Sequence, residues 1–551
     1  MDTKRTILWV VFSFSLLMLW DSYNRYTGKE PLFGPSTAQK APAAAGAGDA
    51  AAPTANVPAA TTGTPTTGVP TGDTAAVKNE SIVITTDLMK AEIDTAGGEI
   101  RHLELLKHHE SGHPDKNVVL FDATPPRTYL GQTGLTGGVY PNHKSMFVAQ
   151  AGPRDLGDAN QVQLVLTSEQ HGVKLIKTFT FKRNDYRIDV KHDVVNNTGA
   201  PITPSLYLQL VRDGAKLPNE SMFYSTFTGP AVYTEGDKFQ KVKFDSIEKG
   251  KDEHATKANN GWIAMVQHYF VSAFIPPADA QREIYTRKLG TDLYAVGTIL
   301  PMGAVAPGAT ASMDATLFSG PQESKRLEEV APGFELVKDY GWLTIIARPI
   351  FWLMTHIHQM LGNWGWTIIV LTIVIKLAFF PLSAAGYRSM AKMKLVTPKM
   401  TDIRTRLKGD PQKMNAAMME LYKKEKINPL GGCFPIVIQI PVFISLYWVL
   451  LASVEMRNAP WIGWIHDLAS PDPWYILPVL MAISMFIQTK LNPTPPDPIQ
   501  AKIMMFMPIA FSVMFFFFPA GLVLYWVVNN ILSIAQQWVI TRRIGDGKKP
   551  A

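Results

Sequence analysis

The sequence predicts a polytopic α-helical membrane protein with six spans, which carries a large all-β domain outside the membrane. Two patterns indicate this fold class. The C-terminal third contains five apolar segments of roughly membrane-spanning length, and residues 79–335 alternate apolar and polar side chains as β-strands do. The composition agrees with this fold class. A chain with 46% hydrophobic and 18% charged residues is typical of a membrane part joined to a water-soluble part.

Residues 1–27 are predicted to be an uncleaved membrane anchor with its amino terminus in the cytoplasm. Lys4 and Arg5 precede an apolar run that ends at Trp20, and the DSYNRYTGKE that follows contains no A-x-A cleavage pattern. A cleaved signal peptide is the alternative. Residues 28–78 are mostly Ala, Pro, Thr and Gly and bury too little apolar surface to offset the entropy of ordering, so we expect a flexible linker.

Residues 79–335 are predicted to form one antiparallel sandwich on the periplasmic side. Apolar residues alternate from 173 to 181 and again from 188 to 194, on either side of an Asn184-Asp185 turn. Turns rich in Gly and Pro separate the other strand-like runs, at 81–85, 161–167, 205–211 and 262–274. No long helical pattern intervenes, which favours a sandwich.

The β domain offers little that points to an enzyme. His108, His109 and His113 form its histidine cluster, which we interpret as a loop of surface histidines because a metal site needs ligands at fixed geometry with supporting contacts. The single cysteine, Cys433, excludes an intramolecular disulfide and a multi-cysteine metal site. The chain contains no Walker A, G-x-S-x-G or dinucleotide-binding pattern. We therefore expect a docking module, with no cofactor, metal or covalent chemistry.

Residues 340–363 are predicted to form an amphipathic helix in the membrane interface. Apolar side chains are interspersed there with polar ones such as Arg348 and His356. The first turn of the next span is the alternative, but Gly362 and Asn363 favour a break before that span.

Five apolar segments follow within a core of residues 364–541. They lie at about 364–382, 433–454, 474–489, 503–518 and 522–540. The last two are joined only by Pro519-Ala520-Gly521, which predicts a tight antiparallel hairpin. Residues 383–428 contain eleven Lys or Arg against four Asp or Glu, and the tail 542–551 is basic as well. By the positive-inside rule both regions are cytoplasmic, so both termini lie inside.

The cytoplasmic segment 384–427 is predicted to be a helical hairpin with a kink at Pro398. Its apolar stripe steps by three and four, at Met393, Val396, Met400, Ile403 and Leu407 and then at Met414, Met418 and Leu421. Gly409 ends the first helix, and Asp410 followed by Pro411 begins the second. An ordinary self-packed hairpin would explain the stripe. Its cations suit ribosomal RNA, acidic lipid headgroups or a soluble partner.

Lys376 lies inside the apolar segment WGWTIIVLTIVIKLAFFPL, where a cation costs about 2.5 to 3.5 kcal/mol. Snorkelling toward the surface is the simple explanation. The predicted orientation, however, puts nearly all other polar residues of the spans in the inner half of the bilayer: Thr372, Gln439, Ser484, Gln488, Asn529, Ser533, Gln536 and Gln537. The last four share one helix face. We therefore expect a hydrophilic groove that opens to the cytoplasm and is closed toward the periplasm.

Such a groove suits a protein that helps polar chain segments into the membrane. A channel needs polar lining in both halves of the bilayer, and a secondary transporter is typically built from internal repeats. A solute transporter or channel with a periplasmic sensing domain is the alternative function. A β domain that binds or modifies carbohydrate is a third hypothesis.

Four motifs carry a family resemblance: NPLGGCFPIVIQIPVFISLY (428–447), WIHDL (464–468), DPWYILPVLM (472–481) and FPAGLVLYWVVNN (518–530). They closely resemble the YidC membrane protein insertases of Gram-negative bacteria, and the resemblance covers the whole chain. It implies a periplasmic β-supersandwich similar to sugar-mutarotase folds and a hydrophilic groove with one cation in an inner-membrane protein. It also implies ATP-independent insertion of nascent and newly made membrane proteins, with the Sec translocase, the ribosome and the lipid bilayer as partners and no small-molecule substrate.

The resemblance places Lys376 at the groove cation and Tyr525, in LVLYW, on the substrate path with Thr372 opposite. Many relatives carry arginine at the position of Lys376. Lysine keeps the charge but loses the planar fork of donors, so a bidentate grip on a carboxylate does not carry over. The predicted groove residues are Lys376, Thr372, Gln439, Gln488, Tyr525, Asn529 and Ser533.

Overall fold

A computed structural model of the chain describes residues 80–110, 113–215, 226–338, 340, 343–407, 409–425, 434–492, 502, 505–506 and 512–546. The predicted anchor 1–27 and linker 28–78 lie outside the described residues, as does much of the predicted span 503–518. The chain divides into two compact units, a β domain that ends at Asp339 and a helical unit that begins at Tyr340.

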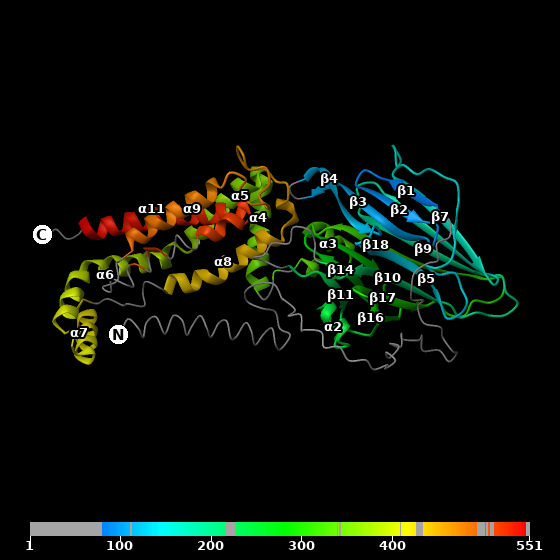
Figure 1. Cartoon of the computed structure of the whole chain (residues 1–551), viewed down its shortest axis with the longest axis horizontal. Helices are drawn as coiled ribbons and strands as arrows, with labels where there is room; N and C mark the ends of the chain where they lie inside the picture. The colour runs from blue at the N-terminus through cyan, green and yellow to red at the C-terminus, as the bar shows by residue number, and fades with distance from the viewer. Residues whose placement is uncertain are drawn as a thin grey trace, which may run out of the picture. The chain divides into compact units, whose positions relative to one another are not determined.

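The β domain consists of two nine-stranded sheets, within the described residues (Figure 1). The first sheet has the order β1 (Ser81–Thr85), β2 (Met89–Asp94), β3 (Glu99–Glu110), β4 (His113–Asp122), β5 (Tyr129–Thr136), β10 (Ser205–Asp213), β17 (Leu293–Pro301), β16 (Arg282–Gly290) and β13 (Lys257–Ala258). The second has the order β12 (Lys238–Lys241), β11 (Gly229–Thr234), β14 (Trp262–Gln267), β15 (Phe270–Ile275), β18 (Thr310–Pro321), β9 (Arg187–Asn196), β8 (Val173–Lys182), β7 (Gln161–Gln170) and β6 (Val148–Ala149). Paired strands are antiparallel, which confirms the predicted sandwich.

The strand predictions hold except at one place. The β8–β9 hairpin is present with Asn184 in the left-handed conformation of its turn (φ 55°), and β1, β7 and β10 begin where predicted. The run 262–274 is wrong as a single strand. It forms β14 and β15, joined by a turn at His268 and Tyr269. Nearly every side chain of both strands is buried, so the run shows no alternation, and no Gly or Pro marks the turn.

The histidine cluster does not form a surface loop. His108 and His109 lie in β3, and His113 begins β4. The His108 ring packs against those of Phe270 and Tyr186, with centroid distances of 5.6 and 6.2 Å. Among the residues that the structure describes, no group of three His, Cys, Asp or Glu side chains is placed to hold a metal.

A buried cation links the two sheets. Lys177 of β8 is fully buried, and its ammonium donates to the carbonyl oxygens of Gly97 (2.7 Å), Thr133 (2.8 Å) and Gly98 (3.2 Å) in the first sheet and its β2–β3 turn. The Phe147 ring covers it at 4.5 Å. Gly97 and Gly98 both have positive φ, which lets the turn aim two carbonyls at one nitrogen. All three N–H donors are thereby satisfied.

The helical unit contains α4 (Thr344–Leu361), α5 (Trp364–Ala378), α6 (Phe380–Arg406), α7 (Pro411–Lys424), α8 (Phe434–Ala452), α9 (Ile476–Leu491) and α11 (Ala520–Asp546). α4 ends at a left-handed Gly362, and the Asn363 side chain caps α5 by accepting from the Trp366 N–H at 3.1 Å. α5 and α6 meet at Phe379 with a bend of 69°. The first helix of the hairpin therefore begins at Phe380, before the predicted start of the hairpin at 384.

α6 and α7 contact each other as a helical hairpin (Figure 1). Val396, Met400 and Leu421 are buried against one another. The Asp410 carboxylate caps α7 by accepting from the N–H groups of residues 412 and 413, and Pro411 is the first residue of that helix. The kink at Pro398 stays a prediction.

Of the described helices, α11 alone is long and apolar enough to cross a membrane by itself, over Ala520–Arg543. α5 and α6 meet the same criterion only as a bent pair. α9 and the part of α8 from Ile440 are apolar but shorter. The remaining predicted spans stay predictions.

Stability of the β domain should depend on pH through Glu99. Its carboxylate is buried and accepts from Gln132 Nε2 at 2.7 Å, and burial raises the pKa of Glu99 from 4.5 to about 7. The folded state therefore holds this proton more tightly than the unfolded chain. The free energy of unfolding should fall by up to about 3 kcal/mol as the pH rises through this range, and Glu99→Gln should remove that loss. Thermal unfolding of the β domain in both chains checks this, and a constant difference across the range would contradict it.

Candidate functional site

The predicted groove cation lies between helices of the helical unit. Lys376, in the last turn of α5, is 8% exposed, and its ammonium donates to Ser533 Oγ of α11 at 2.8 Å. The Ser533 hydroxyl in turn donates to the carbonyl of Asn529 at 2.7 Å. No carboxylate among the described residues lies within ion-pair distance of Lys376. A buried ammonium with three donors thus has one neutral acceptor within the described structure.

Two other predicted groove residues are buried. Thr372 lies one turn before Lys376 and donates to the carbonyl of Ile368 at 2.6 Å, which is an intrahelical bond. Tyr525 of α11 packs against the Phe443 ring at 5.6 Å. Both side chains are closed off from solvent in this structure, so neither borders an open path.

A second polar cluster joins α9 to α11, which run side by side (Figure 1). Gln488 Nε2 donates to Gln537 Oε1 at 2.5 Å, and Gln537 Nε2 donates to Asn492 Oδ1 at 3.2 Å. Asn530 of α11 adds a further contact between the two helices, because its Nδ2 lies 3.2 Å from Ser484 Oγ of α9. Gln488 therefore meets α11 through Gln537 and makes no described bond to Lys376.

The polar residues of α11 thus divide between two neighbouring helices. Ser533 faces Lys376, whereas Asn530 and Gln537 face α9. The spacing of these residues in the sequence indicates that they share one face of α11, but it does not indicate which neighbouring helix each of them contacts. Sequence reasoning missed Asn530 and Asn492, although Asn530 ends the FPAGLVLYWVVNN motif. The side chain of the remaining predicted residue, Gln439, lies outside the described residues.

The bundle is tied together at the end remote from α7 by the segment 453–475. Asn363 Nδ2 donates to the carbonyl of Pro460 at 3.1 Å. The first N–H groups of α11, at Ala520 and Gly521, donate to the carbonyls of residues 470 and 468 at 2.7 and 2.9 Å. These bonds satisfy helix-end donors that would otherwise need water. They hold the starts of α5 and α11 against one connecting segment.

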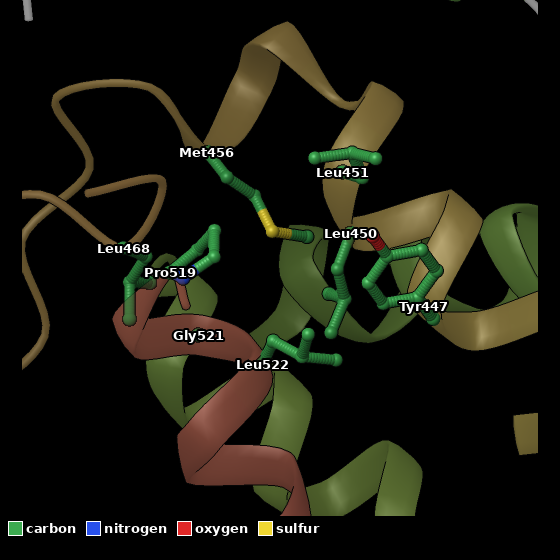
Figure 2. Close-up of a pocket in the computed structure, with 8 residues that line it drawn as sticks. All are labelled: Tyr447, Leu450, Leu451, Met456, Leu468, Pro519, Gly521 and Leu522. Carbon is green, nitrogen blue, oxygen red and sulfur yellow. The ribbon is translucent and has the colours of Figure 1, made fainter. Parts of the chain in front are cut away.

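Apolar side chains fill the space under this connecting segment. Figure 2 shows a small pocket there, formed by α8, α11 and the segment itself and lined by Tyr447, Leu450, Leu451, Met456, Leu468, Pro519, Gly521 and Leu522. A small-molecule site usually adds a few convergent polar groups to an apolar wall. This lining is almost wholly apolar, so the pocket offers no polar route through this end of the bundle.

Asp472 should be the main support of the connecting segment. Its buried carboxylate accepts from Trp464 Nε1 (2.9 Å) and from the N–H groups of Trp474 (3.0 Å) and Leu477 (2.7 Å) at the start of α9. Asp472→Ala leaves these donors unpaired and should lower the free energy of unfolding by about 1–3 kcal/mol. Tryptophan fluorescence during thermal unfolding in detergent measures this. His466→Ala, on the exposed part of the same segment, is the matched control, and equal losses in both variants would contradict the role of Asp472.

Comparison with known proteins covers both units. Residues 81–353 match the family model described as the YidC periplasmic domain, and residues 356–547 match the 60Kd inner membrane protein model. The chain is 75% identical over 562 residues to the membrane protein insertase YidC of Janthinobacterium sp. (strain Marseille), covering 99% of this chain and 100% of that protein. It is 76% identical over 571 residues to the membrane protein insertase YidC of Herminiimonas arsenicoxydans, covering all of both chains.

Solved structures resemble the chain more loosely. A crystal structure of an active YidC insertase with its first transmembrane domain resolved covers 84% of this chain and 92% of its own, at 17% identity and a TM-score of 0.39. A galactose mutarotase related enzyme from Lactobacillus acidophilus covers 44% of this chain and 97% of its own, at 12% identity and a TM-score of 0.30. The assignment rests on the two family models and the sequence relatives. The chain belongs to the family of YidC membrane protein insertases, which are inner-membrane proteins with a periplasmic domain.

Proposed function

We propose that this protein inserts newly made membrane proteins, here called clients, into the bacterial inner membrane and helps them fold, without covalent chemistry or ATP. The observation that carries the proposal is the unequal solvation of two buried lysines. Lys177 of the β domain has a carbonyl for each of its three N–H donors. Lys376, in a helix of the inner-membrane family region, has one neutral hydroxyl among the described residues. A cation solvated this sparsely remains able to attract an acidic group.

The polar residues around Lys376 support a route for the flank of a client. The α6–α7 hairpin receives an emerging apolar segment, whose polar flank then enters among the helices from the cytoplasmic side. Lys376 attracts the flank when it is acidic. The membrane potential draws each negative charge outward with about 2.3 kcal/mol per 100 mV, and partitioning of the apolar segment into lipid drives release.

Entry requires the helices around Lys376 to part, because Thr372, Lys376 and Tyr525 are buried in the described state. The 69° bend at Phe379 supports α6 as the moving element, since the helix changes direction there without a loop. The connecting segment 453–475 supports a closed periplasmic end. A client flank would therefore reach lipid between helices and not through the far end of the bundle.

The proposed topology has six spans, cytoplasmic termini and the β domain in the periplasm. One face of α4 supports an interfacial position for that helix, because Ile345, Trp352 and Met360 are exposed while Ala347 and Met354 on the other face are buried. We also propose the Sec translocase and the ribosome as partners. The Lys and Arg residues of the hairpin support the ribosome as a partner. No described observation favours a solute transporter.

The charge of Lys376 should decide the insertion of clients with acidic translocated tails. Lys376→Arg should retain insertion because it keeps a cation at the same depth. Lys376→Glu should reduce it by about tenfold or more, which corresponds to roughly 1.4 kcal/mol, because a negative charge repels the tail. Protease protection of clients in inverted membrane vesicles measures both. A matched client with a neutral tail is the control, and undiminished insertion of the acidic client by the Lys376→Glu variant would refute the electrostatic role.

The α6–α7 hairpin should matter more for insertion than the β domain. α6 contacts α11, and Tyr387 near the start of α6 forms a hydrogen bond with Ser533. The deletion should therefore begin after Met393 and end at Lys424, with a short Gly-Ser bridge in place of the removed residues. We expect this variant to lose more insertion than a chain that lacks most of 79–330, because the hairpin carries the cations and the apolar cluster of residues 396, 400 and 421. Vesicle insertion assays rank the two variants, and the reverse order would refute this division of labour.

A further inference from the structure

The bonds between α9 and α11 form an amide ladder, defined here by Gln488, Gln537 and Asn492. Each bond has a direction: Gln488 donates to Gln537, which donates to Asn492. Gln537 is 3% exposed and uses both ends of its amide. Together with the contact between Asn530 and Ser484, these bonds extend along about 12 Å of the α9 side and about 10 Å of α11. A shift of one residue along either helix would misalign them, because each bond needs particular atoms at particular angles.

The ladder determines which way Ser533 points. At about 100° per residue, Ser533 lies roughly 40° around the helix from Gln537 and 60° from Asn530. Rotation of α11 that releases Gln537 from α9 therefore also turns Ser533 away from α5. Apolar side chains on the same seam would tolerate such a rotation, because their contacts have no direction.

We infer that the amide ladder is a positioning device, which fixes the rotation of α11 so that Ser533 stays beside Lys376. Gln488 then acts through α11 and not as part of the surface that meets a client. The geometric part of this inference stands on the described bonds alone. Its consequence for insertion rests on the proposed function, because it requires that the surroundings of Lys376 govern the handling of acidic clients.

The test measures how accessible residue 533 is. In a full-length chain that carries Cys433→Ser and Ser533→Cys, a membrane-impermeant maleimide is applied to inverted vesicles. Ser533 is 7% exposed, so labelling should be slow with the ladder intact. Gln488→Leu/Gln537→Leu should speed it by about threefold, the factor that an interhelical hydrogen bond of average strength supplies. Ile483→Leu/Val539→Leu, on exposed faces of the same helices, is the matched control and should leave the rate unchanged.

Insertion provides the second readout, measured with Ser533 and Lys376 intact. Ladder variants should lower the ratio of acidic-tail to neutral-tail insertion, whereas a merely structural defect would lower both equally. Should the double variant fail to fold, Gln488→Met removes one bond and is tested in its place. Unchanged labelling overturns the positioning role. Faster labelling with an unchanged ratio upholds the positioning role and overturns the proposed part of Lys376 in insertion.

Discussion

A cation inside a helix bundle must be solvated by the bundle, and α11 supplies that solvation for Lys376. Its Ser533 hydroxyl accepts a hydrogen bond from the ammonium and donates one to the carbonyl of Asn529, one turn back, so the two bonds polarise each other. The burial of Lys376 and its contact with α11 depend on this arrangement. Without it, the ammonium would be buried with no described acceptor, a state that strongly favours unfolding or neutralisation.

The two buried lysines illustrate how burial alone leaves a role undecided. Lys177 is enclosed by a turn whose glycines direct carbonyls at it, and its bonds cross from one sheet to the other. Each of its three N–H donors has an acceptor, and these bonds hold the two sheets together. Lys376 is nearly as buried but has two donors without a described acceptor. Removing a charge from water without pairing it is expensive, and such an arrangement persists where function requires it.

The sequence predicted local features better than the contacts between distant ones. The period of two identified β8 and β9, and the Asp410-Pro411 pair identified the start of α7, because these signals arise within a few residues. The turn between β14 and β15 was missed because burial of both faces removes the alternation that reveals a strand. Among the candidate site residues, Lys376 and Ser533 are brought together, whereas Gln488 is paired elsewhere. A helical face can be read from spacing, but the neighbour that it meets is set by packing over long sequence distances.

α11 directs Ser533 toward α5 and its amide side chains toward α9. This arrangement explains why a helix that solvates a cation also carries Asn and Gln residues. In lipid, apolar contacts between helices gain little over contacts with acyl chains, so they constrain rotation weakly. Hydrogen bonds constrain it strongly because they require particular atoms at particular angles. Gln537 and Ser533 are one turn apart, so an orientation imposed at the α9 seam is transmitted rigidly through less than two turns of helix to the α5 seam. In the function proposed above, this rigid transmission would keep the partner of Lys376 in place when a client enters.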